Sequence, residues 1–291
     1  MIGIDWGTTS FRAFRLTADG AIRDRRTSAR GIMAVPDQRF GDTLREEIGP
    51  WLAAGEDRVL LSGMVGSRQG WVEAPYLPLP AGAADLAASL IDIPFDWGQV
   101  KLVPGIAGVD ASGVAEVMRG EETQLFGVEA LMRAGGLACL PGTHSKWARV
   151  ADGRLVGFST HMTGEVFAAL KGHTILGRMM RDGPVVLESF DAGLRRSADP
   201  GGLLHHVFGV RAEALAGRLD DGASASYLSG ILIGHEIRAA LDGGVVHLVG
   251  SSELTALYAR AIAACGGMAE RHDADAAAYG LGRIGALARW G

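Results

Sequence analysis

The sequence predicts an α/β protein made of two similar halves, each combining a β-sheet with helices. Its 291 residues are enough for about two domains. Short apolar segments typical of strands alternate with longer segments of helical periodicity. In addition, residues 7–13 match residues 142–148 at four of seven positions, at the same place in the predicted strand order. We therefore predict an internal duplication.

Composition and charge exclude several other classes of protein. Apolar residues make up 48% of the chain and charged residues 21%, as in ordinary globular proteins. A formal net charge of −5 without a basic run argues against nucleic-acid binding. No apolar run reaches the roughly 18 residues of a membrane span, and no signal peptide is visible, so we expect a cytoplasmic protein. The two cysteines, Cys139 and Cys265, suggest neither a disulfide framework nor a metal site.

The first half begins with three predicted strands, and Ala18-Asp19-Gly20 is the turn signal between the last two. Apolar residues at helical spacing then predict a helix, and a short buried strand leads into a glycine-rich segment, residues 62–70. A loop, a helix and another strand follow. The predicted strands are residues 1–5, 11–17, 21–28, 58–61 and 100–103, the helices are 37–53 and 83–91, and the loop is 71–82.

The same order restarts in the second half, after a helix expected over residues 116–134. Three strands come first, with Asp152-Gly153 as a hairpin turn between the last two. Four helices follow, and the chain then closes in the order strand, helix, strand, helix. The predicted strands are residues 137–140, 145–151, 154–160, 245–249 and 267–272, and the helices are 164–180, 188–197, 202–217, 222–241, 253–264 and 275–289.

Two hairpins that combine glycine with hydroxyl residues carry the chemistry. The first is Gly7-Thr8-Thr9-Ser10, after a strand that ends in Asp5, and the second is Gly142-Thr143-His144-Ser145. Glycine lets the backbone approach a ligand closely, so that N–H and hydroxyl groups can face an anion such as phosphate. An aspartate beside such a loop suits Mg²⁺. The alternative for each hairpin is a plain β-turn, and the recurrence of the pattern favours a phosphate site.

These segments resemble known motifs. Ile2–Arg12 and residues 140–147 resemble the two phosphate motifs of the sugar kinase, Hsp70 and actin superfamily, and Val245–Ser252 resembles its adenosine motif. Four further segments are similar to those of the 2-dehydro-3-deoxygalactonokinase family, in an order that covers nearly the whole chain: Ser62–Trp71, Met118–Gln124, Pro141–Trp147 and Thr160–Glu165.

The resemblance implies two duplicated ribonuclease-H-like (actin-like ATPase) domains with ATP in a cleft between them. The first domain would span roughly residues 1–118 and bind a small sugar acid, and the second, 119–274, would bind ATP. The C-terminal helix, 275–291, would pack back on the first. The implied reaction is transfer of the γ-phosphate of ATP to the 6-hydroxyl of 2-dehydro-3-deoxy-D-galactonate, in galactonate breakdown.

The resemblance also implies roles for individual residues. Asp5 would anchor Mg²⁺. Arg12 would lie near the γ-phosphate, unless it is an ordinary surface residue of its strand. The groups expected to line the nucleotide are Gly7, Thr8, Thr9, Gly142, Thr143, His144 and Ser145, with Gly250 and Ser251 at the adenosine.

A carboxylate is needed to take the proton of the hydroxyl group. Related sugar kinases place an Asp after a glycine at this point, and Gly120-Glu121-Glu122 resembles that position with Glu instead. We expect Glu121 to be the base, although a glutamate at a helix N-terminus also interacts favourably with the helix dipole. Glu122 and Asp110 remain open as alternatives.

The substrate's carboxylate calls for an arginine, whose fork of donors matches it. We expect Arg68 in this role, with Ser67 and Gln69 at the keto or hydroxyl groups. Trp71, Glu73 and Tyr76 either form the wall of the pocket or simply pack. Glu165 either faces the cleft or caps a helix.

Other interpretations remain or are rejected. One alternative is a kinase of the same superfamily that acts on another sugar or 2-keto-3-deoxy acid, and another is a nucleotide-switched regulator or chaperone. The GxGxxG match at residues 280–285 is rejected as a dinucleotide motif because it lies in a predicted helix with no strand before it. The oligomeric state is left open.

Overall fold

The computed structural model describes residues 1–273 and 275–291, so the predicted end of the second domain at residue 274 lies outside them. Contacts divide the chain into two compact units. Unit 1 comprises residues 1–138, 148–159 and 272–291, and unit 2 comprises residues 139–147 and 160–271. This division differs from the predicted boundary after residue 118, which stays a prediction. The C-terminal helix belongs to unit 1.

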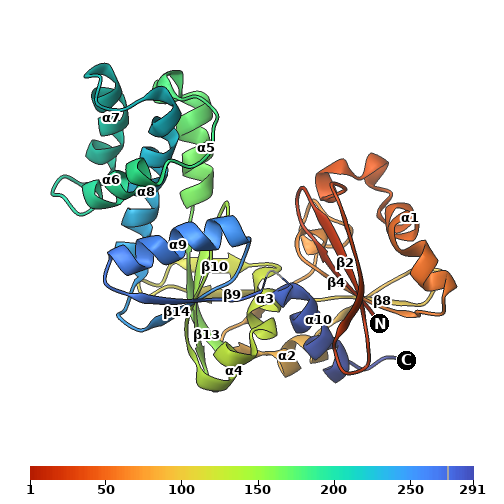
Figure 1. Cartoon of the computed structure of the whole chain (residues 1–291). Helices are drawn as coiled ribbons and strands as arrows, with labels where there is room; N and C mark the ends of the chain where they lie inside the picture. The colour runs from red at the N-terminus through yellow and green to blue at the C-terminus, as the bar shows by residue number, and fades with distance from the viewer. Residues whose placement is uncertain (274) are drawn as a thin grey trace. The chain divides into compact units, whose positions relative to one another are not determined.

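A six-stranded sheet with the order β3-β2-β1-β4-β8-β7 forms the framework of unit 1. Its strands β2, β4 and β8 are labelled in Figure 1. The central strand β1 is antiparallel to β2 and parallel to β4. The register places Asp5 of β1 between Arg12 of β2 and Ser62 of β4. The strands are β1 Ile2–Trp6, β2 Phe11–Leu16, β3 Ile22–Ser28, β4 Arg58–Ser62, β7 Ile91–Ile93 and β8 Gln99–Leu102.

Helix α1, Phe40–Ala53, packs its apolar stripe against this sheet. Phe40, Leu44 and Ile48 are buried at the predicted helical spacing. A three-stranded sheet with the order β10-β9-β5 adds to the unit. The remaining elements of unit 1 are β5 Tyr76–Pro78, β6 Ala81–Gly82, β9 Gly105–Val109, β10 Ala115–Met118, α2 Ala83–Ala88, α3 Glu121–Gly127, α4 Glu129–Ala134 and α10 Ala276–Leu287.

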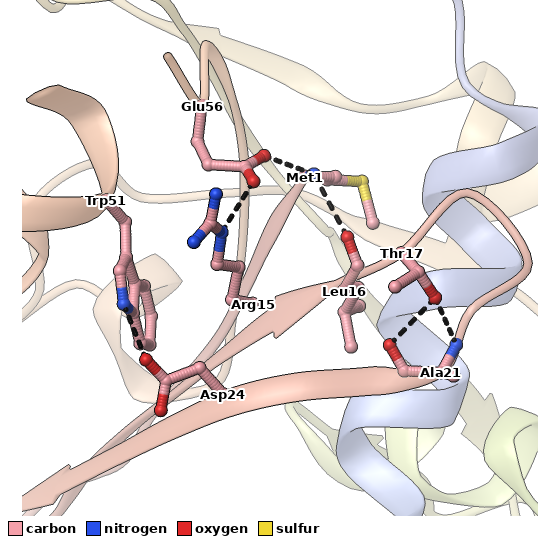
Figure 2. A network of polar contacts seen from close by, with 8 residues as sticks. All are labelled: Met1, Arg15, Leu16, Thr17, Ala21, Asp24, Trp51 and Glu56. Atoms are coloured by element: carbon pink, nitrogen blue, oxygen red, sulfur yellow. Dashed lines mark hydrogen bonds and ion pairs between the residues drawn. The ribbon is translucent and has the colours of Figure 1, made fainter. Parts of the chain in front are cut away.

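A network of polar contacts holds the start of β1 in place (Figure 2). The Met1 ammonium lies 2.7 Å from a carboxylate oxygen of Glu56 and donates to the carbonyl of Leu16 at 3.3 Å. Arg15 Nε donates to the other Glu56 oxygen at 2.7 Å. Partial burial opposes ionisation of Glu56, but the hydrogen bonds from the ammonium and Arg15 outweigh it and lower the pKa of Glu56. The network ties β1 and β2 to the segment before β4.

A second six-stranded sheet has the order β15-β14-β11-β12-β13-β6. Without the edge strands β7 and β6, the two sheets have the same strand order. The order β13-β12-β11-β14-β15 in the second sheet corresponds to β3-β2-β1-β4-β8 in the first. This confirms the predicted duplication and α/β class. The strands are β11 Gly136–Leu140, β12 Ser145–Ala151, β13 Arg154–His161, β14 Val245–Leu248 and β15 Met268–Arg271.

Unit 2 also contains a group of helices between β13 and β14 (Figure 1, green to blue). They are α5 Thr163–His173, α6 Leu187–Arg196, α7 Gly202–Leu215 and α8 Asp221–Ala240, followed after β14 by α9 Ser252–Ala264. Short 3₁₀ turns lie at Ile32–Ala34, Pro36–Gln38, Met64–Gly66 and Gly177–Met179. Within the described residues, no helix is both long and apolar enough to cross a membrane.

Three expectations about local structure are wrong. The helix expected over residues 164–180 ends at His173, and a separate 3₁₀ turn follows at Gly177–Met179. The helix expected over residues 116–134 begins only at Glu121, because β10 pairs with β9 up to Met118. The expected loop 71–82 contains β5 and β6. Asp110 lies in the turn of the β9–β10 hairpin, where its carboxylate accepts hydrogen bonds from the N–H groups of Ser112 and Val114. The strands β5 and β6 pair with distant residues, in β9 and β13 respectively, and local periodicity does not reveal such pairing.

Candidate active site

The first glycine-hydroxyl hairpin follows β1. Gly7 N–H donates to the carbonyl of Ser10 at 2.9 Å, which closes the turn and leaves the Thr8 and Thr9 side chains exposed. Asp5, whose side chain is only 14% exposed, accepts hydrogen bonds from Nε and Nη2 of Arg12. The structure thus brings two predicted residues, a carboxylate and a cation, to one end of the sheet.

Gly31 supports this hairpin from behind and was missed by the sequence analysis. Gly31 lies so close to the hairpin that a Cβ at this position would overlap the backbone of Thr8 and Thr9. Ile32 and Met33 donate backbone hydrogen bonds to the carbonyls of Gly7 and Thr8. A glycine in a loop gives no sequence signal of its own, because the close approach arises only in the folded chain.

Three chain segments of unit 1 meet beside Asp5. A Cβ at Gly63, just after β4, would lie 3.1 Å from Asp5 Oδ1, and a Cβ at Gly120 would lie 3.1 Å from Gly63 Cα. Both glycines have positive φ, 96° and 104°, which favours glycine at these positions. The ends of the parallel strands β1 and β4 and the start of α3 therefore lie together, and this is where ligands bind in many α/β sheets.

The two glutamates at the start of α3 have different surroundings. Glu121 is partly exposed, and its carboxylate accepts the N–H of Arg119 at 3.0 Å. Glu122 is fully buried and accepts the N–H of Gly120 and the hydroxyl of Thr123. Burial, with a contribution from the nearby charge of Glu121, raises the pKa of Glu122 to about 8. Glu122 is therefore protonated near neutral pH.

The segment after β4 carries the predicted substrate residues. Arg68 is 88% exposed and lies 3.4 Å from Glu73, and Gln69 is also exposed. The hydroxyl oxygen of Ser67 is buried. Trp71 packs beside the core, with its ring centroid 6.2 Å from that of Phe40 and 6.3 Å from that of Phe95. Its environment is that of a packing residue. Nothing in this placement assigns Arg68 to a ligand.

The second hairpin rests on the first turn of α5. A Cβ at Gly164 would overlap the carbonyl of Gly142, and the N–H of Glu165 donates to the carbonyl of Thr143 at 3.0 Å. Thr143 and His144 are exposed. His144 Nε2 contacts the carboxylate of Glu165. The start of an α-helix favours anions, so this position suits the phosphate role that the motif predicts.

Ser145 differs from its neighbours because its side chain is fully buried. Its hydroxyl lies 3.0 Å from the hydroxyl of Tyr258, which donates to a carboxylate oxygen of Glu236 at 2.7 Å. Because a carboxylate can only accept a hydrogen bond, the Tyr258 hydroxyl donates to Glu236 and accepts a hydrogen bond from the Ser145 hydroxyl. The Ser145 oxygen in turn accepts the N–H of Gly142 at 3.4 Å. Ser145 therefore shapes the hairpin from the inside.

The predicted adenosine residues lie next to the second hairpin, within unit 2. Gly250 has a φ of 152°, and a Cβ there would lie 3.7 Å from the carbonyl oxygen of Pro141. Ser251 is the N-cap of α9, where its hydroxyl accepts the N–H of Leu254 at 3.4 Å. The structure thus brings the second and third motifs together.

Comparison with known proteins places this geometry in context. A model of the 2-keto-3-deoxy-galactonokinase family matches residues 5–284. An Escherichia coli (strain K12) 2-dehydro-3-deoxygalactonokinase is 34% identical, covering 91% of this chain and 90% of its own. A Rhizobium meliloti (strain 1021) protein, named as a probable 2-dehydro-3-deoxygalactonokinase, is 39% identical, with coverage of 94% and 92%.

Solved structures agree with the sequence relatives. A Sinorhizobium meliloti protein, whose description names the same kinase, has a TM-score of 0.88 at 38% identity and covers 97% of both chains. The activator of 2-hydroxyisocaproyl-CoA dehydratase from Clostridium difficile, with bound ADPNP, has a TM-score of 0.51 at 14% identity, covering 99% of this chain and 94% of its own. The latter shares the fold alone. Together they confirm the predicted fold class, a duplicated ribonuclease-H-like architecture.

Proposed function

Since this chain belongs to the 2-keto-3-deoxy-galactonokinase family, we propose that it uses ATP to phosphorylate 2-dehydro-3-deoxy-D-galactonate at the 6-hydroxyl. The single observation that carries this proposal is the family match over residues 5–284. The reaction is a step of galactonate catabolism, and the enzyme is a phosphotransferase with an alcohol as acceptor. A cytoplasmic location is part of the same proposal, because the reaction draws on the cell's ATP.

The two hairpins supply what phosphoryl transfer needs, which is positioning and neutralisation of charge. In the proposed site, the exposed side chains of Thr8, Thr9, Thr143 and His144 would contact the phosphates, while the N–H groups of Gly7 and Gly142 close the two turns. Gly250 and Ser251 would line the adenosine. Ser145 contributes indirectly, since its hydroxyl holds the N–H of Gly142 within the hairpin.

Asp5 fits the role of a Mg²⁺ ligand. Its carboxylate is largely buried at the end of β1, beside the hairpin, and carboxylates together with phosphate oxygens are the ligands that Mg²⁺ prefers. The ion, held by Asp5, would supply positive charge to the phosphates of ATP. Arg12 contacts the same carboxylate and would add a second positive charge at this end of the sheet.

Glu121 is the proposed base for the substrate hydroxyl. It lies at the start of α3, next to Gly120, which adjoins Gly63 and through it Asp5. Glu122 is a poor candidate near neutral pH because its raised pKa keeps it protonated. Asp110 is a poor candidate for a different reason, since its carboxylate is committed to the turn between β9 and β10.

For the sugar acid, we retain the segment after β4 as the proposed binding region. The predicted contacts Ser67, Arg68, Gln69 and Trp71 lie on it, but their surroundings differ: Ser67 has a buried hydroxyl oxygen, Arg68 is 88% exposed and Trp71 packs beside the core. Closure over the substrate would exclude water, which could otherwise accept the phosphoryl group.

The proposal is tested by measuring ADP release from ATP with a panel of acceptors. The panel contains 2-dehydro-3-deoxy-D-galactonate, its C4 epimer 2-dehydro-3-deoxy-D-gluconate, and the neutral hexoses glucose and galactose. We expect kcat/KM to be highest for the galactonate derivative. Equal or higher values for a neutral hexose would contradict the proposed substrate, and a preference for the gluconate epimer would show a kinase of the same superfamily with a different acid.

A further inference from the structure

A buried arginine that the sequence analysis did not select occupies the proposed substrate region. Arg119 lies between β10 and α3 and is 8% exposed. Its Nη2 donates to the carbonyl of Ala74 at 2.7 Å, and its guanidinium lies 4.3 Å from the centroid of the Tyr76 ring. Neither of these partners carries a formal negative charge. In the part of the chain that the structure describes, Nε and Nη1 have no acceptor.

The hydroxyl of Ser67, close to Arg119, also lacks a hydrogen-bond partner among the described residues. In residues 1–273 and 275–291, five buried side-chain polar atoms lack a hydrogen-bond partner, and three of them are Arg119 Nε, Arg119 Nη1 and Ser67 Oγ. Ser67 adjoins Gly66, where a Cβ would lie 3.0 Å from Arg119 Nη1. The unpartnered donors therefore belong to one location, beside the segment that follows β4.

Such a group of donors indicates a missing acceptor. A buried N–H group without an acceptor loses the hydrogen bonds it would make to water, and a buried guanidinium also needs a negative charge nearby. Buried polar groups in native proteins nearly always have partners, so exceptions point to a water, ion or ligand that binds there. The anion that best matches a guanidinium by shape and charge is a carboxylate or a phosphate.

We propose that Arg119, and not the exposed Arg68, binds the carboxylate of the 2-keto acid, with the Ser67 hydroxyl as a further donor. This inference rests on the proposed function. Arg119 is two residues before Glu121, so one end of the acid would lie at Arg119 while its distal hydroxyl group lies at the proposed base. A carboxylate is favoured over a phosphate because the phosphates of ATP have the two hairpins as their proposed site.

Tyr76 controls access to this arginine. Its ring stacks on the guanidinium and is 43% exposed, whereas Arg119 Nε and Nη1 do not reach the solvent. The carboxylate can reach these donors only after the ring, or the Ser67 segment, moves aside. We expect the rotation of Tyr76 to accompany binding of the acid.

The test compares two acceptors that differ only in the proposed contact. One is the keto acid, and the other is the 3-deoxyhexulose in which a CH₂OH group replaces the carboxylate. Their ratio of kcat/KM measures how strongly the enzyme recognises the carboxylate. It is determined for the wild type, Arg119→Met, Arg119→Lys and Arg68→Met, together with KM for ATP and the thermal unfolding midpoint of each variant.

We expect the wild type to prefer the acid by about 100-fold, as for a buried charged partner. Arg119→Met should reduce this ratio to near unity, mainly through KM for the acid, with KM for ATP within about twofold. Arg119→Lys should retain part of the preference, and Arg68→Met should retain nearly all of it. If Arg119→Met does not fold, Arg119→Lys and Ser67→Ala provide the same test. Each should lower the ratio of kcat/KM for the acid to kcat/KM for the 3-deoxyhexulose.

Three results would overturn the inference while the proposed function stands. They are an unchanged ratio in the Arg119 variants, an equal loss of activity towards both acceptors, and a collapse of the ratio in Arg68→Met. Failure of the proposed function looks different, because the wild type itself would then release no ADP with the keto acid.

Discussion

Single residues show how the second hairpin is held in shape. Burial raises the pKa of the Tyr258 phenol, so this group stays protonated and links Ser145 to Glu236. We predict that Tyr258→Phe raises KM for ATP several-fold, because Ser145 loses the acceptor that directs its proton away from Gly142. The free energy of unfolding should fall by about 1–3 kcal/mol, since among the described residues Glu236 then keeps only the indole N–H of Trp147 as a side-chain donor.

Steady-state kinetics and urea unfolding measure the two effects. Tyr227→Phe is the matched control, because Tyr227 lies in the same unit and its hydroxyl makes no hydrogen bond to the described residues. It should change neither quantity appreciably. A normal KM for ATP in Tyr258→Phe would show that the hairpin keeps its shape without this network.

The buried Glu122 gives a pH dependence of stability whose sign can be stated. Its pKa is about 8 in the folded protein and about 4.5 in a model peptide. Between these values the folded protein holds a proton that the unfolded chain has released. The free energy of unfolding therefore falls as pH rises, by up to about 1.4 kcal/mol per pH unit, and this contribution levels off above pH 8.

We predict that Glu122→Gln removes this slope, because the amide is neutral at every pH. Urea unfolding of both proteins from pH 5 to pH 9 measures it, with Glu129→Gln, on the exposed face of α4, as a control that keeps the wild-type slope. Parallel pH profiles for the wild type and Glu122→Gln would mean that Glu122 is ionised in the folded protein.

At the scale of elements, α10 fixes the helix that carries the proposed base. Gly280 of α10 lies so close to α3 that a Cβ would overlap the carbonyl of Thr123. Gly280→Ala should therefore lower the free energy of unfolding by about 1–3 kcal/mol through overpacking, and should lower kcat by displacing Glu121. The rejected GxGxxG match is thus a packing surface within a helix, as predicted.

Gly282→Ala is the control within the same helix. A Cβ there would have its nearest neighbours at 3.6 Å, an ordinary contact, so the substitution should be neutral or stabilising by up to about 1 kcal/mol. Chemical unfolding and kcat of both variants give the comparison. Equal stability of the two variants would show that α3 and α10 can separate without loss.

The elements also show what local sequence reveals. Helices with a clear apolar stripe, such as α1, and strands joined by turn signals, such as β2 and β3, were predicted within a few residues. The short strands β5, β9 and β10 were not. β5 pairs with the distant β9, whereas β9 and β10 form a local hairpin whose turn at Asp110 was not recognised in the sequence. Residue identity alone does not distinguish such strands from loops.

The whole molecule repeats one strand order in two sheets, and the recurrence of the glycine-hydroxyl motif predicted this. The glycine-hydroxyl motif also predicted the loops that follow the central strands β1 and β11, because close approach to a phosphate requires particular residue types. It did not predict Gly31 or Arg119. Their importance comes from backbone crossing and from burial without a partner, and both arise only once distant segments come together.

The central claim is that this chain transfers a phosphoryl group from ATP to the keto acid. The most direct measurement is ³¹P NMR of a reaction containing 2-dehydro-3-deoxy-D-galactonate, ATP and Mg²⁺, with Asp5→Asn as the control. We predict a new phosphomonoester signal equal in amount to the ADP formed, split by the protons of a CH₂ group, and lost by orders of magnitude in Asp5→Asn. ADP accompanied only by inorganic phosphate, with the keto acid unmodified, would contradict the account.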